Sequence, residues 1–147
     1  MAITASGLYG LTLEKALNNT VAIDWEADTN KGALFTDTVA PNFDTDTAYG
    51  ASPYDANETS GGSWPAGGVA LTGTELTLAA GTMKFDATDV SVATTDITDA
   101  MGYLLYADAA TDEAMLLVDF GTQVTTVNGT FTVTWHGNGI MTIDYTP

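Results

Sequence analysis

Residues 130–145 read TFTVTWHGNGIMTIDY, and this segment indicates the fold class more clearly than any other part of the chain. Phe131, Val133 and Trp135 alternate with threonines, a period of two that is typical of a strand with one buried face. The next four residues, HGNG, are turn formers, and a second alternating run begins at Ile140. We therefore predict a β-hairpin here, with Trp135 on its core face.

Similar patterns recur along the chain, which is rich in threonine interleaved with Val, Phe and Ile. We expect further strands at 21–25, 31–36, 69–78 with a bulge at Gly73, 82–86, 89–92, 100–106 and 114–120. The segments 100–106 and 114–120 have apolar residues at both odd and even positions, as is typical of central strands covered on both sides. One short helix is expected at 11–18. The sequence thus predicts an all-β fold, a β-sandwich of about eight mostly antiparallel strands with one N-terminal helix.

Two segments fall outside this pattern. Residues 37–68 contain three prolines and many turn formers, which predicts a long loop excursion and a working surface. Residues 1–10 carry no charge and are expected to be an N-terminal arm that a neighbouring subunit orders, with 11–147 as a single domain. The residues expected to make contacts with partners are Ile3, Leu8 and Tyr9 in the arm and Phe43, Tyr49, Tyr54 and Trp64 in the loop. The aromatic residues of the loop should hold it in place and form the exposed platform.

The charge of the chain excludes several classes of partner. Nineteen acidic residues face three lysines and no arginine in 147 residues, for a formal net charge of −16. Phosphate contacts need basic surfaces, so we expect no binding to nucleic acid or to an anionic membrane. No apolar run approaches the roughly 18 residues of a spanning helix, and no secretory leader is evident at the start. Without cysteine, the chain has no disulfide, thiolate nucleophile or Cys-based metal site.

Catalytic and metal-binding residues are also sparse. The lone histidine, His136, lies in the HGNG turn and is expected to be solvated, and no acid pair stands out as a glycosidase pair. Oxygen ligands for Ca²⁺ are plentiful in the loop, at Asn42, Asp44, Asp46, Asp55 and Glu58. Their spacing fails the EF-hand pattern, because Ala48 and Tyr49 stand where a ligand and glycine belong. We therefore expect Asx turns, with no metal or cofactor and no enzymatic activity.

An ordered set of segments resembles a family of small structural proteins of tailed bacteriophages. The segments are LEKAL at 13–17, AIDWEADT at 22–29, ALFT at 33–36, WPAGGVALTG at 64–73, FDATDV at 85–90, VDFG at 118–121, NGTFTVTW at 128–135 and GIMTI at 139–143. The resemblance spans most of the chain. It implies a virion structural protein, specifically a capsid decoration (cement) protein.

The resemblance implies partners and a location as well. The partners would be the major capsid protein and further copies of this chain, as a homotrimer at the junctions of capsid subunits. The protein would be made in the host cytoplasm and end on the capsid surface of the virion. A tail or neck component is the alternative within phages, and a carbohydrate-binding module is the alternative of another class. Because the arm is uncharged and cations are few, we expect attachment through apolar contacts.

Overall fold

The computed structural model describes residues 3–27 and 29–146. Over these residues the chain consists mainly of antiparallel β-strands with one α-helix, so the predicted all-β class is confirmed. The elements are β1 (Gly7–Leu8), α1 (Gly10–Leu17), β2 (Asn30–Thr36), β3 (Val69–Ala70), β4 (Glu75–Ala79), β5 (Thr82–Asp86), β6 (Val90–Thr95), β7 (Ala100–Ala107), the short 3₁₀ helix η1 (Asp108–Ala110), β8 (Glu113–Val124), β9 (Gly129–Val133) and β10 (Met141–Asp144).

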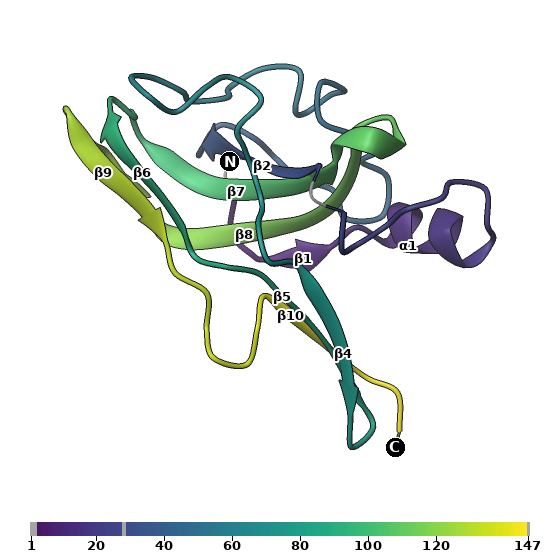
Figure 1. Ribbon diagram of the computed structural model, residues 1–147. Coiled ribbons are helices and arrows are strands. Elements are labelled where there is room, and N and C mark those ends of the chain that lie inside the picture. The colour runs from purple at the N-terminus through teal and green to yellow at the C-terminus, as the bar shows by residue number, and fades with distance from the viewer. Residues whose placement is uncertain (1–2, 28, 147) are drawn as a thin grey trace.

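The strands form three sheets. The central sheet has the order β1-β8-β7-β2-β3, and two smaller sheets have the orders β10-β5-β4 and β6-β9. Residues of both small sheets, Phe85 from one and Val90, Phe131 and Val133 from the other, pack in one core with residues of the central sheet. The three-stranded sheet extends away from the central sheet towards the C-terminal end of the chain (Figure 1).

Both faces of the central sheet are covered, as predicted for 100–106 and 114–120. Leu34, Tyr103 and Leu105 point into a core shared with the two small sheets. The alternate residues, including Phe35 and Leu104, point into a second core on the opposite face. This alternation follows from the two-residue period of a strand, and it explains why these strands are apolar on both parities.

The loop 37–68 contains no named strand and covers the second face of the central sheet (Figure 1). Its backbone bonds directly to strand residues: the amide of Thr59 donates to the carbonyl of Leu34 at 2.9 Å, and the amide of Ala114 donates to that of Thr47 at 2.9 Å. Gly68 approaches β2 so closely that a Cβ there would lie 1.9 Å from the carbonyl oxygen of Gly32. The predicted long loop is confirmed, and it serves as a packing layer.

Two strand predictions are wrong, the second of them in part. Residues 21–25 form no strand, because the Asn30 side-chain amide ties the carbonyls of Asp24 and Trp25, each at 3.0 Å, into a local turn. The segment 69–78 is divided between two sheets, with Gly73 at the break in place of a bulge. Gly73 has a φ of +60°, a conformation that glycine adopts readily.

The predicted hairpin at 130–145 is also wrong: its turn is present, but its two strands do not pair with each other. The amide of Gly139 donates to the carbonyl of His136 at 2.7 Å, as in a β-turn. However, β9 pairs with β6, and β10 pairs with β5. The backbone amide of Trp135 is held by Asp89 at 2.9 Å and that of Ile140 by the Phe85 carbonyl at 2.8 Å. The turn therefore carries the chain from one small sheet to the other.

The first residues do not form a separate arm over the part described, which begins at Ile3. Gly7 pairs with Leu117 of β8, and the Tyr9 amide donates to the carbonyl of Met115 at 3.1 Å. Ile3 is fully buried against Gly102, which has no side chain in the way. This segment is thus ordered by its own chain, and the expected dependence on a neighbouring subunit is not needed.

Candidate functional site

The loop aromatic residues expected to form an exposed platform are buried or half-buried, so that expectation is wrong. Tyr54 and Trp64 are at most 2% exposed, and Phe43 and Tyr49 are half-buried. Of the contact residues expected in the arm, Ile3 and Tyr9 are fully buried and Leu8 is half-buried. The loop aromatic residues are buried because their rings pack on aromatic residues of the strands. The Tyr49 ring stacks on Tyr106, whereas Tyr54 meets Phe35 and Trp64 meets Phe131 edge-on. These aromatic residues therefore hold the loop on the sheet, as predicted, but they form no platform.

The acids of the loop act as local turn and cap residues. Asp46 accepts the backbone amide of Asn42 at 2.7 Å, and Asn42 accepts that of Asp44 at 3.1 Å. Glu58 accepts the Tyr49 hydroxyl at 2.9 Å and the Gly67 amide at 2.6 Å. Burial raises the pKa of the Asp46 carboxyl, and burial with the Glu58 contact raises the pKa of Tyr49 to about 12.

Within 3–27 and 29–146 there is no group of three or more His, Asp or Glu side chains arranged to hold a metal. The other acid pairs bind loop backbone or loop hydroxyls. Asp96 accepts the amide of Asn128 at 2.7 Å, and Asp99 accepts the Thr125 hydroxyl at 3.2 Å. His136 is exposed at its turn, with its Nδ1 accepting the Asn138 amide at 3.1 Å.

The distinctive surface of the molecule is one face of the three-stranded sheet. The pairing register places Leu76, Phe85 and Met141 in one cross-strand row and Leu78, Met83 and Ile143 in the next. Cross-strand neighbours share a face, so this face is apolar over both rows. The first row is anchored on the core by Phe85, which is fully buried, whereas Leu78 in the second row is 70% exposed.

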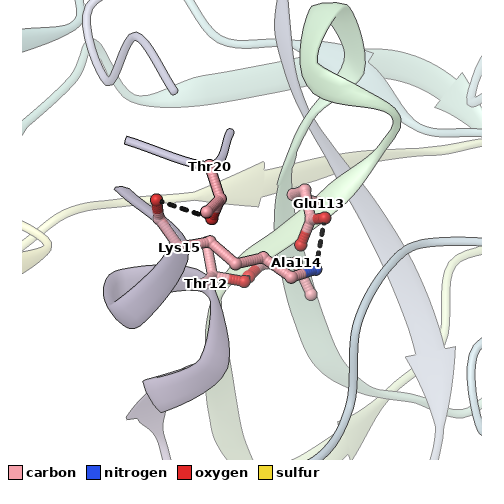
Figure 2. A network of polar contacts seen from close by, with 5 residues as sticks. All are labelled: Thr12, Lys15, Thr20, Glu113 and Ala114. Atoms are coloured by element: carbon pink, nitrogen blue, oxygen red, sulfur yellow. Dashed lines mark hydrogen bonds and ion pairs between the residues drawn. The ribbon is translucent and has the colours of Figure 1, made fainter. Parts of the chain in front are cut away.

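Helix α1 lies opposite this apolar face of the three-stranded sheet. On one side it is fixed to β8: the Thr12 hydroxyl donates to the Ala114 carbonyl at 2.6 Å, and Lys15 Nζ lies 2.5 Å from Glu113 Oε1 (Figure 2). The Glu113 side chain is only 8% exposed, so this ion pair is largely shielded from water. On the other side Leu13, Ala16 and Leu17 follow the three-and-four spacing of a single helix face.

Between α1 and this face of the sheet lies an apolar groove of about 200 Å³. Its lining residues are Leu8, Leu13, Ala16, Leu17, Ile23, Trp25, Leu76, Met83, Met141 and Ile143. A second hollow of about 240 Å³ shares Leu8 and Met141 with it and continues along β1 and β8. Leu17, at the end of α1, is 78% exposed although it lines the groove. Apolar side chains that remain in water in this way are available for contact with another macromolecule.

The groove is bordered by acids. Glu14 follows the lining residue Leu13 in α1, and Asp24 and Glu26 flank Trp25; all three acids are exposed. The Glu26 carboxylate accepts the backbone amide of Leu76 at 3.0 Å, and Lys15, the next residue in α1, is paired with Glu113. The free charge around the apolar lining is therefore negative.

Most residues of this groove were not among the predicted contact residues. Of the expected contact residues only Leu8 lines it. The alternation at 75–86 and 140–145 was a usable signal, but pairing 140–145 with 130–135 assigned its apolar side to a closed core. The chemistry that the groove can supply is shape and apolar contact, with acids at the border.

No family model, curated protein or solved structure matches the chain. The described part of the chain contains no helix with the length and apolar character needed to cross a membrane.

Proposed function

We propose that this chain is a non-enzymatic structural protein of a bacteriophage virion, most specifically a decoration protein on the outer surface of the capsid. The observation that carries the proposal is the open apolar groove between α1 and the three-stranded sheet. A protein whose work is attachment needs such a surface on an otherwise stable body. The ordered resemblance of segments 13–17 to 139–143 supplies the class of particle.

The charge of the chain supports an external position. A formal net charge of −16 would repel packaged DNA, and it keeps an abundant surface protein soluble. The partner in this proposal is the major capsid protein. Self-association as a homotrimer is part of the same proposal, and sedimentation of the isolated protein tests it, with a strict monomer as the contradicting result.

A tail or neck position is the second candidate, supported by the same groove and the same resemblance. The carbohydrate-binding alternative depended on exposed aromatic rings in the loop. Tyr54 and Trp64 are buried, and Tyr49 is stacked on Tyr106, so that alternative loses its support.

The test is the copy number of this protein in purified, DNA-filled particles, measured against the major capsid protein by quantitative mass spectrometry. A decoration protein should be present in the same molar range as the capsid protein. A few copies per particle would support the tail or neck instead, and absence from particles would contradict both.

A further inference from the structure

The apolar groove between α1 and the three-stranded sheet has a chemistry that limits which kinds of molecule can bind in it. Leu17, which lines it, is 78% exposed, and Leu78, which pairs with the lining residue Met83, is 70% exposed, whereas the lining residues Leu76 and Met83 are half-buried. The groove therefore has an apolar floor, an open top and two fixed walls. It suits a short apolar segment of another chain that enters from solvent.

The border of the groove sets the charge of that segment. Glu14, Asp24 and Glu26 are exposed next to its lining residues Leu13 and Trp25, and the Glu26 carboxylate accepts the amide of the lining residue Leu76. A second copy of this chain would bring a surface of the same sign, because each copy carries a formal net charge of −16. Like charges brought together at an interface are unfavourable, and opposite charges steer association and fix orientation.

We propose that the groove binds an apolar segment of a different protein that is flanked by lysine or arginine side chains. This proposal rests on the proposed function for the identity of that protein, which would be a capsid protein. The apolar residues supply the affinity, and the acids at the border select a basic partner over a second copy and speed the encounter. The same acids disfavour an anionic lipid surface as the occupant.

Site-specific photocrosslinking in the cells that produce the protein identifies the occupant. Leu17→p-benzoylphenylalanine places the probe in the groove. Val127→p-benzoylphenylalanine is the matched control, since Val127 is 83% exposed in the connection between β8 and β9 and does not line the groove. We expect the probe at position 17, and not the one at 127, to crosslink to an apolar segment of another protein with basic residues beside it.

Peptide binding then tests the chemistry. The crosslinked segment, made as a synthetic peptide, is titrated against the wild-type protein, Leu17→Glu and Val127→Glu. We expect Leu17→Glu to weaken binding about tenfold or more, because a charge then faces the apolar segment, and Val127→Glu to leave it unchanged. Glu14→Lys should slow association several-fold with little change in dissociation. Asp55→Lys, at an exposed acid of the loop 37–68, should leave both rates unchanged.

Three results would overturn the inference: a crosslink from position 17 to another copy of this chain, a crosslinked segment without basic residues, or equal crosslinking from positions 17 and 127. The identity of the crosslinked protein is a separate readout. A basic, apolar segment from a protein that is not part of a virion would support the groove inference and contradict the proposed function. Incorporation into virions together with a crosslink to a second copy would support the proposed function and contradict the groove inference.

Discussion

The central sheet and the three-stranded sheet differ in how completely their apolar faces are covered. Tyr103, Leu104 and Leu105 on β7 are fully buried, because the small sheets cover one face and the loop 37–68 covers the other. The apolar face of the three-stranded sheet is covered over its first row, Leu76, Phe85 and Met141, by the core that it shares with the central sheet, whereas Leu78 in the second row remains 70% exposed. Folding stability is therefore concentrated in the first region and the capacity for binding in the second.

The largest expected effect is alkaline unfolding through buried tyrosines that pack on the central sheet: Tyr103 in β7, Tyr54 in the loop and Tyr9 next to β1. Burial raises the pKa of Tyr9 and Tyr103 and, for Tyr54, raises it to about 12. A raised pKa in the folded state means that the stabilisation is complete below the ordinary value of 10.0 and is lost as the pH rises towards 12. Each such group removes about 1.4 kcal/mol per pH unit in this window.

The measurement is the urea midpoint of unfolding at a series of pH values from neutral to alkaline, with tyrosinate absorbance followed in parallel. We expect the midpoint to fall steeply above the ordinary tyrosine pKa, together with the appearance of tyrosinate. Ionisation of most of the six tyrosines with the fold still intact would show that the buried rings are accessible, and would contradict the covered central sheet.

Substitution of the tryptophans compares the two regions directly. Trp64 is 1% exposed between Tyr103 and Phe131, so Trp64→Ala should cost about 3–5 kcal/mol of unfolding free energy. Trp25 lines the groove and is half-buried, so Trp25→Ala should cost only about 1–2 kcal/mol. Denaturant titration of both variants gives the difference. Equal losses would mean that the groove region contributes to stability as much as the central sheet does.

The ion pair between Lys15 and Glu113 links the two regions, since it fixes α1 to β8 (Figure 2). Lys15→Met leaves the shielded Glu113 carboxylate unpaired, and we expect a loss of about 2–3 kcal/mol. The double variant Lys15→Met with Glu113→Leu should recover most of it, because apolar packing then replaces the pair. Thermal or chemical unfolding of the three proteins tests this, and a double variant as unstable as the single one would contradict the explanation.

The smallest effect on stability is expected at the open side of the groove. Leu17→Glu and Leu78→Glu should change the unfolding free energy by less than about 0.5 kcal/mol, because both side chains are already mostly in water. Circular dichroism and chemical unfolding check this. A loss well above that value would indicate that these leucines serve the fold and not a partner.

Local patterns predicted some elements well and misplaced others, for physical reasons. The helix, β2, β7 and β8 follow from periodicity, because each lies in the environment that its pattern describes. The hairpin failed because period two reports which face of a strand is buried and says nothing about which strand it pairs with. Trp135 shows the same limit: its ring packs on Tyr103 as its parity predicts, yet it is only half-buried.

The candidate site was harder to predict than the fold. Aromatic residues in a long, proline-containing loop suggested an exposed platform, but Tyr54 packs into the core on one face of the central sheet and Trp64 into the core on the other. The groove combines residues from positions 8 to 143, and its openness depends on how the three-stranded sheet extends from the body (Figure 1). Neither the burial of the loop aromatic residues nor the position of the groove can be predicted from a local sequence pattern.

The most direct test is co-sedimentation of the purified protein with virus particles that lack it, at low salt and in about 1 M NaCl, where charges are screened within about 3 Å. If the apolar groove is the attachment surface, the wild-type protein and Val127→Glu should remain bound at both salt concentrations, and Leu17→Glu should stay in the supernatant. Release of the wild-type protein by salt, or binding of Leu17→Glu at the wild-type level, would contradict attachment through the groove.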